Sequence, residues 1–388
     1  MNNFYDIIVV GAGPAGAMAA GEAVSQGASV MLLERKSIVG YPIRCGEALG
    51  RKSLQLLVDE DDSWVVNMVH TACFVSPGGH KVYVDNIGTG LILDRQKFDE
   101  HLVKLAQKQG VELYLEKNVV GLEKKSDRII IVKVKDNAYK IHEIECHLLI
   151  AADGVDSRIA RWAGISTALP LSLIETCIQY VVADVKIDDD ICYFYMGEEI
   201  APNGYLWIFP RGDGKANIGI GISGEKAKNR GPQYYLDRFI KEKYRNAKII
   251  RRNVGGVPVA KCIDELCGDN FMVVGDAARQ VNCLNGGGII YCMNAGKIAG
   301  KIAAKAVMEH DYSAKNLQEY PRQWLKGLGR NQISSFELKE AILRIPDSTK
   351  DHIAGKISNK RNLSYFSIFK SVFWTNPFLL IKLIRFFK

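Results

Sequence analysis

The fold is decided by one stretch near the start of the chain: residues 4–10 (FYDIIVV), 11–16 (GAGPAG), 17–25 (AMAAGEAVS) and 29–35 (SVMLLER). The two apolar runs predict strands, and the alanine-rich run predicts a helix between them. Gly11 permits a tight turn, Gly13 lets the backbone approach a pyrophosphate, and Gly16 lets the helix pack against the strand. Glu34 ends the second strand, where an acid binds ribose hydroxyls. This order predicts a βαβ unit that binds an adenine dinucleotide.

The composition excludes several classes of protein. The 388 residues are 47% hydrophobic and 24% charged, which suits a folded enzyme of two or three domains. The nine cysteines form no CxxC pair and no cluster at metal-ligand spacing, so we expect a reducing cytoplasm, no disulfide framework and no metal. We expect neither a signal peptide nor a membrane-spanning helix, because the first strand begins at once and no run of about 18 apolar residues occurs. The net charge of +8 suits solubility or an anionic membrane surface, and no nucleic-acid partner is expected.

Two later regions extend the predicted sheets. Residues 71–75 and 81–84 flank a Pro-Gly-Gly turn and predict a hairpin, and the apolar run 141–150 predicts a third parallel strand of the dinucleotide domain. Residues 172–222 alternate, are rich in aromatic residues, and predict a separate antiparallel sheet. Their aromatic strand either packs in a core or faces an apolar ligand. Residues 219–224 also match GxGxxG, but they interrupt an alternating strand and are rejected as a second nucleotide site.

Three further groups of residues carry candidate chemistry. Residues 40–47 form an irregular loop that crowds Arg44, Cys45 and Glu47 together; it is either a solvated surface turn or part of an active site at a sheet end. Asp276 follows an apolar strand, and three glycines at 286–288 open a small-residue helix. Such glycines either form a flexible loop or expose N–H groups that bind an anion or a polar ring edge.

These motifs, in this order, resemble the FAD-dependent flavoproteins that share the aromatic-hydroxylase fold. Two more stretches, residues 42–47 (PIRCGE) and 205–210 (YLWIFP), resemble the geranylgeranyl reductases, especially the archaeal enzymes that saturate membrane lipids. The resemblance extends to about residue 310, and the C-terminal part matches only in general character. The chain departs from the family at Cys283, where a proline is common ahead of the three glycines.

The resemblance implies an α/β fold with a discontinuous FAD-binding Rossmann-like domain (residues 1–62, 94–165 and 263–310). An inserted antiparallel-sheet substrate domain (63–93 and 166–262) and a C-terminal helical region (311–388) complete the expected organisation. The residues implied around FAD are Gly11, Gly13, Ala15, Gly16, Glu34, Arg35, Arg44, Cys45, Gly46, Ala48, Arg95, Val119, Asp276, Gly288 and Ile289.

The activity that the resemblance implies is the saturation of isolated C=C bonds in geranylgeranyl chains of ether phospholipids, by hydride transfer from reduced flavin. Cys45, Tyr205 and Trp207 are the candidate catalytic residues. Cys45 either donates a proton, gates the flavin, or only packs on its ring. Tyr205 and Trp207 share one strand face by their i, i+2 spacing, and we expect that face to point toward the lipid and the flavin.

Two other functions stay open on the sequence. One is a flavin monooxygenase that hydroxylates or epoxidises an apolar substrate, and the other is a non-catalytic flavoprotein that binds a membrane or a partner. The electron donor is either NADPH, docking transiently, or a reduced carrier such as ferredoxin, because no second nucleotide-binding βαβ unit is visible.

The last residues of the chain predict membrane association. Over residues 378–388, Lys382, Arg385 and Lys388 recur every three positions and form one charged stripe on a helix of leucine, isoleucine and phenylalanine. The segment is too short to span a bilayer but suits its interface. It either packs on the body of the protein or attaches it peripherally to the inner face of the cell membrane.

Overall fold

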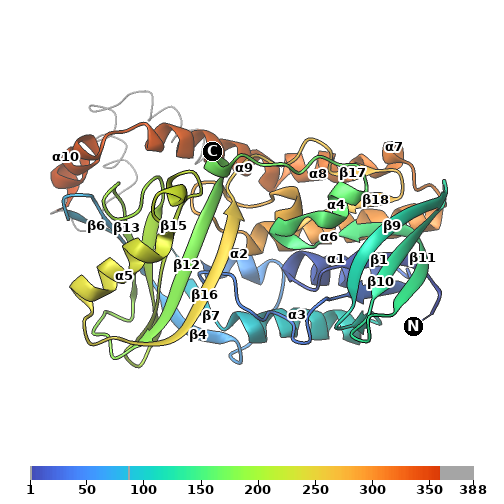
Figure 1. Ribbon diagram of the computed structural model, residues 1–388, viewed down its shortest axis with the longest axis horizontal. Coiled ribbons are helices and arrows are strands. Elements are labelled where there is room, and N and C mark those ends of the chain that lie inside the picture. Colours follow the sequence, from blue (N-terminus) through green and yellow to red (C-terminus); the bar gives the residue numbers. More distant parts are fainter. Residues whose placement is uncertain (1, 86–87, 359–388) are drawn as a thin grey trace. The chain divides into compact units, whose positions relative to one another are not determined.

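The computed structural model describes residues 2–85 and 88–358 (Figure 1). Two compact units divide the chain, and each is assembled from three separate segments. Unit 1 consists of Met1–Tyr41, Gln96–Ala168 and Ala260–Ile333, and unit 2 of Pro42–Arg95, Leu169–Val259 and Ser334–Lys388. Residues 42–62 group with unit 2 and residues 311–333 with unit 1, and the predicted domain bounds stay a prediction.

Unit 1 is built on an eight-stranded sheet with the predicted βαβ at its centre. The path of strands is β17 (Cys267–Gly268), β18 (Phe271–Val273), β11 (Ile141–Ala151), β1 (Phe4–Val10), β2 (Val30–Leu33) and β8 (Glu112–Tyr114), and β10 (Ile129–Lys135) and β9 (Asn118–Ser126) continue from β11. β18, β11, β1, β2 and β8 pair in parallel, which confirms residues 141–150 as a parallel strand of this sheet. β10 pairs antiparallel with both β11 and β9.

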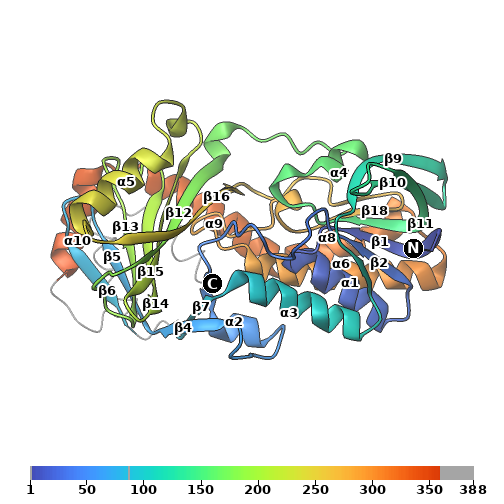
Figure 2. The same cartoon turned by 60° about the horizontal axis from the view of Figure 1, so that its bottom comes forward.

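The helices of unit 1 include one pair packed at unusually short range. They are α1 (Pro14–Ser25), α3 (Arg95–Lys108), α4 (Arg158–Trp162), α6 (Ile289–Glu309), α7 (Ala314–Leu317) and α8 (Glu319–Lys326); α9 (Leu328–Leu343) contributes to both units. Both views show α1 beside α6 (Figures 1 and 2). A Cβ atom on Gly296 or Gly300 would lie only 2.1 or 2.3 Å from the carbonyl oxygens of Ala15 and Ala19. The small residues of both helices therefore fix the start of α1, which follows the glycine turn.

Unit 2 contains a seven-stranded sheet and a three-stranded sheet. The larger has the order β16 (Lys248–Pro258), β12 (Ile174–Ala183), β15 (Lys215–Ser223), β14 (Tyr205–Gly212), β13 (Ile191–Tyr195), β5 (Thr71–Val75) and β6 (Lys81–Val84), and the smaller β3 (Ala48–Gly50), β7 (Gly90–Leu93) and β4 (Val65–Val69). The helices are α2 (Arg51–Gln55), α5 (Pro232–Lys243) and α10 (Asp347–Ile357). The hairpin of β5 and β6 has the predicted bounds. The larger sheet is antiparallel as predicted except at β13 and β5, which pair in parallel.

The two faces of the larger sheet differ in chemistry. One face is an apolar core in which Tyr180, Ile208 and Ile218 pack against Leu236 and Phe239 of α5. The opposite face carries the alternate residues of the same strands, and many of these are polar and buried, among them Glu175, Gln179, Asn217 and Ser223. Burying polar side chains costs free energy unless they are partnered, so this second face is where a functional site is expected.

Candidate functional site

The glycine turn of unit 1 leaves open space at only one of its three glycines. Gly11 has φ +107°, and a Cβ atom on it would lie 2.3 Å from the Ala152 carbonyl oxygen; one on Gly16 would lie 1.8 Å from the Gly11 oxygen. A Cβ on Gly13 meets no atom within 4 Å. Gly11 and Gly16 are therefore required by the packing of the protein itself. The space at Gly13 fits the close approach of a pyrophosphate.

The acid at the end of β2 is tied to this turn. Glu34 accepts a hydrogen bond from the backbone N–H of Ala12 at 3.0 Å and another from Lys36 at 3.0 Å. This fixes the carboxylate beside the start of α1, as ribose recognition requires. The neighbouring Arg35 pairs with Asp156 at 2.9 Å on the surface.

The second half of the predicted cofactor site meets the first half within unit 1. Asp276 lies in the 3-10 turn Gly275–Ala278, and its Oδ1 is 3.3 Å from the position of a Cβ on Gly288. A Cβ on Gly275 would in turn lie 2.9 Å from that of Ala15. Asp276, Gly288 and Ile289 at the start of α6 are thus brought to the glycine turn, although they are far from it in sequence. Val119 is buried on β9 of the same unit.

The loop before the three glycines is held in part by Cys283, where we expect, from the sequence, a departure from the family pattern. Its buried thiol donates to the Ala260 carbonyl at 3.1 Å. Asn282 accepts hydrogen bonds from the backbone N–H groups of Leu284 and Asn285. The loop is therefore held by side chains that a proline could not supply.

The predicted flavin loop in unit 2 is anchored by a buried carboxylate. Glu47 is fully buried, and its Oε2 accepts from Asn217 at 2.9 Å, Arg211 at 3.0 Å and Arg251 at 3.4 Å. Its Oε1 accepts from the backbone N–H of Arg95 at 3.3 Å. Glu47 has φ +69°, a strained conformation that this network holds in place. The loop that carries Arg44, Cys45, Gly46 and Ala48 is therefore rigidly attached to the larger sheet.

Sequence reasoning missed the partners of Glu47, although a signal was present. Arg211 is an even number of residues away from Tyr205 and Trp207 on β14, the spacing of residues on one strand face. Asn217 pairs with Phe209 across the sheet. Charged or amide side chains at such positions, inside otherwise apolar strands, indicate a buried polar partner. The sequence could not show that this partner is Glu47.

Cys45 lies in the same loop and keeps its proton. Its sulfur accepts from the Glu47 backbone N–H at 3.2 Å, and its carbonyl accepts from Gln179 at 3.2 Å. Burial raises the pKa of the thiol, and the positive charge of Arg95 only partly opposes this. A thiol held in this state is not a thiolate nucleophile.

Aromatic side chains cover the middle of the polar face. The rings of Tyr205 and Trp207 are 5.8 Å apart and those of Trp207 and Phe209 are 6.1 Å apart, which confirms that Tyr205 and Trp207 share a face. The indole N–H of Trp207 donates to Gln179 at 2.8 Å, and a Cβ on Gly219 would lie 2.3 Å from the indole. Trp207 is therefore held flat against bare backbone. A Cβ on Gly46 would lie 3.2 Å from the Phe209 ring, so the flavin loop lies directly on these aromatic residues.

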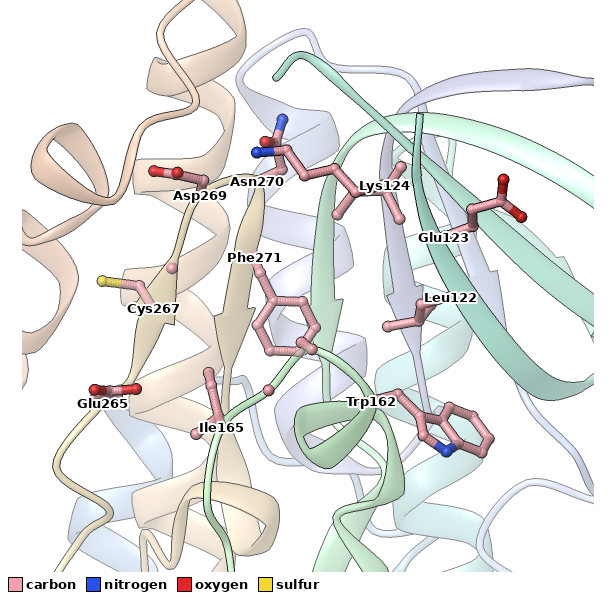
Figure 3. Close-up of a pocket in the computed structure, with 14 residues that line it drawn as sticks. Leu122, Glu123, Lys124, Trp162, Ile165, Glu265, Cys267, Asp269, Asn270 and Phe271 are labelled. Atoms are coloured by element: carbon pink, nitrogen blue, oxygen red, sulfur yellow. The ribbon is translucent and has the colours of Figure 1, made fainter. Parts of the chain in front are cut away.

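Unit 1 also contains a cavity of about 300 Å³, which lies away from the predicted site residues (Figure 3). Its walls include Leu122 of β9, Trp162 of α4 and Phe271 of β18. None of the predicted cofactor or catalytic residues lines it. In unit 2 a second cavity, of about 250 Å³, is lined by Glu175 and Lys339 among others.

The fold and the nucleotide-binding turn together define an FAD-dependent oxidoreductase. The residues present fit the cofactor, because Gly13 faces open space while Glu34, Asp276 and Gly288 are grouped around the same turn. A family model described as FAD dependent oxidoreductase matches residues 6–43, and one described as geranylgeranyl reductase catalytic domain matches residues 174–257.

The relatives narrow this class to one family. The chain is 40% identical over 363 residues to digeranylgeranylglycerophospholipid reductase 1 of Methanococcoides burtonii, covering 92% of this chain and 89% of that one. It is 38% identical over 397 residues to the digeranylgeranylglycerophospholipid reductase of Methanosarcina acetivorans, covering 100% and 97%. A crystal structure of a geranylgeranyl bacteriochlorophyll reductase-like protein from Thermoplasma acidophilum superposes with a TM-score of 0.92 at 31% identity, over 99% of both chains. The chain belongs to the digeranylgeranylglycerophospholipid reductase family.

More distant structures share the fold alone. A flavin-dependent brominase, Bmp2, superposes with a TM-score of 0.72 at 18% identity, over 99% of this chain and 93% of that one.

Proposed function

We propose that this protein saturates the C=C bonds of geranylgeranyl chains in ether-linked membrane phospholipids. The observation that carries the proposal is the aromatic face of Tyr205, Trp207 and Phe209, on which the loop of Cys45 and Gly46 rests. The strands of this face fall inside the residues that match the geranylgeranyl reductase catalytic domain. The names of the relatives supply a digeranylgeranylglycerophospholipid as the substrate class.

Bound FAD supplies the hydride in this reaction. The residues of the chain position the substrate and exclude water, because an isolated alkene offers no carbonyl group that a hydrogen bond could polarise. Trp207 suits this positioning role, since its one polar atom is already satisfied by Gln179. We propose NADPH or a reduced carrier such as ferredoxin as the source of electrons.

A single incubation tests the function. Purified FAD-loaded protein is reduced with dithionite under anaerobic conditions, mixed with a geranylgeranyl ether phospholipid, and the lipid is analysed by mass spectrometry. We expect mass gains in units of two hydrogens. Oxygen consumption with NADPH and insertion of oxygen into the lipid would instead identify a monooxygenase, and a flavin that no donor reduces would identify a non-catalytic flavoprotein.

Cys45→Ala tests the role of the thiol. We expect turnover to fall by roughly ten-fold or more while FAD content is unchanged, because the thiol belongs to the loop that we propose to contact the flavin and is not needed to fold that loop. Cys45→Ser keeps an acceptor for the Glu47 N–H and is the matched control. Unchanged turnover in Cys45→Ala would reduce Cys45 to a packing residue.

We also propose peripheral membrane attachment through the C-terminal basic stripe. Residues 378–388 lie outside the described residues, so the support comes from their sequence. Deleting residues 376–388 removes three basic side chains, each worth about 1 kcal/mol at an anionic surface, and is expected to weaken binding to anionic liposomes by roughly 100-fold while FAD stays bound. Equal sedimentation of both forms would contradict this. Within the described ranges, no helix combines the length and apolarity needed to cross a bilayer.

A further inference from the structure

Glu175 is a buried carboxyl group in unit 2 with no role in the site described so far. It is the second residue of β12 and is 7% exposed. Across the ranges that the structure describes, no hydrogen bond to its carboxyl oxygens is found. A buried carboxyl group without a structural partner is costly to retain, so a function is expected for it.

One side of Glu175 faces the cavity of about 250 Å³. Its lining is mostly polar: Ser172, Leu173, Glu175, Asn203, Ser223, Val259, Lys339, Glu340, Leu343 and Arg344. A buried water needs roughly 10–15 Å³ and several polar partners, so the cavity has room and partners for several waters. The Lys339 ammonium is held there by the Val259 carbonyl at 2.7 Å.

The other side of Glu175 reaches the aromatic face. Cys177, Gly221 and Tyr205 are paired in one row across β12, β15 and β14. Gly221 has no side chain and leaves a gap in this row. A Cβ atom added to Gly221 would lie 2.9 Å from Glu175 Oε2 and 3.1 Å from Cys177 Sγ. The Glu175 carboxyl therefore extends from the cavity to the row that contains Tyr205.

Saturating a C=C bond requires a proton as well as a hydride, and the thiol and phenol groups near this face hold their protons tightly. Burial raises the pKa of the Cys45 thiol, and it raises the pKa values of Cys177 and Tyr205 well above their usual range. Burial also raises the pKa of Glu175, to about 7, while the positive charge of Lys339 opposes the shift. Glu175 is thus the one acid among these four that is both protonated and able to release its proton near neutral pH.

We propose that Glu175 is the proton donor of the reduction. This inference rests on the proposed function, in which the hydride comes from reduced flavin. The hydride forms a C–H bond at one alkene carbon, the Glu175 proton forms the second C–H bond at its neighbour, and the π bond breaks. FAD is left oxidised, and the carboxylate that remains is reprotonated from water in the cavity.

Glu175→Gln is the decisive variant, because it keeps the shape of the side chain and removes the acid. We expect turnover to fall by about 100-fold or more, with FAD content, flavin reduction by dithionite and lipid binding unchanged. Asp184→Asn is the matched control: it removes an exposed carboxylate of the same unit that pairs with Lys248 at 2.9 Å and lies away from this cavity, and its turnover is expected to stay within about two-fold of wild type. Glu175→Gln should also lose more turnover than Cys45→Ala. This comparison shows whether the carboxyl or the thiol is the proton source.

A pH titration gives an independent readout. Wild-type turnover should fall as pH rises through about 7, because the donor is lost when Glu175 ionises, and infrared difference spectra should show a protonated carboxylic acid that disappears over the same range. Lys339, Glu340 and Arg344 line the cavity with Glu175, and Cys177 and Tyr205 interact with it from the aromatic face. Asp184→Asn should keep the infrared signal and Glu175→Gln should lose it.

The outcomes distinguish this inference from the proposed function. Wild-type turnover by Glu175→Gln, or an infrared signal that persists in this variant, would overturn the role of Glu175 and leave the function standing. Failure of the wild-type protein to saturate any geranylgeranyl lipid would overturn the function, and the proton-donor role with it. The infrared titration still reports in that case whether Glu175 is a protonated acid near neutral pH.

Discussion

Glu47→Gln is expected to lower the free energy of unfolding by about 3–5 kcal/mol, because it leaves buried positive charge without a counter-charge. The carboxylate is fully buried, and the Arg211 side chain opposite it is only 12% exposed. Glutamine fills the same volume but cannot neutralise Arg211 or Arg251. Its amide nitrogen is also a donor, so it cannot accept the hydrogen bonds that the carboxylate accepts from these arginines. Urea denaturation of the FAD-free protein measures the change as a lower midpoint.

A surface ion pair of the same unit is the control. Lys248 and Asp184 approach to 2.9 Å, as closely as Glu47 and Arg211, but their side chains are 80% and 53% exposed. Lys248→Ala is therefore expected to cost less than about 1 kcal/mol. A double-mutant cycle of Glu47→Gln with Arg211→Met should recover part of the loss, since the second change removes the uncompensated charge. Equal costs for Glu47→Gln and Lys248→Ala would show that the buried network does not anchor the loop.

Gly13→Ala is expected to weaken FAD binding by roughly 30-fold while leaving the stability of the FAD-free protein within about 0.5 kcal/mol of wild type. In the protein alone an added methyl group meets nothing within 4 Å. With the cofactor bound it would occupy the space in which the backbone approaches the pyrophosphate, and overpacking of this kind costs about 2 kcal/mol. FAD fluorescence titration gives the Kd, and thermal unfolding of the apoprotein gives the stability.

Gly16→Ala provides the contrast, because its methyl group would lie 1.8 Å from the Gly11 carbonyl oxygen. This variant should destabilise the apoprotein itself. If Gly13→Ala bound FAD like wild type, the cofactor would not approach this turn. If it unfolded as readily as Gly16→Ala, the space at Gly13 would not be open.

The parts of the fold that sequence predicted well are those set by local pattern. The βαβ unit, the hairpin of β5 and β6, and the alternating strand at residues 217–222 follow from hydrophobic period and turn residues, and all are present. That Tyr205 and Trp207 lie on the same face of β14 follows from the same two-residue period.

The parts that sequence could not predict depend on contacts between distant segments. Alternation shows that Glu175, Asn217 and Arg211 lie on the same kind of face, but not which loop covers it. The parallel pairing of β13 with β5, and the separation of β3, β4 and β7 into their own sheet, likewise depend on which segments meet. The pKa of Glu175 depends on burial and on Lys339, a residue far along the chain.

The interleaving of the two units has a consequence for synthesis on the ribosome. β5 and β6 emerge early and expose an unpaired strand edge until β13 arrives at residue 191, and β1 waits in the same way for β11 at residue 141. Neither unit can close around its core until most of the chain has been made, so loop closure over long distances is required before the native contacts stabilise anything. The nascent chain therefore passes through a long interval with apolar strands exposed, a state that favours aggregation. A chain that ended just before residue 259 would keep all the described strands of unit 2 but would lack β17 and β18 at one edge of the sheet of unit 1.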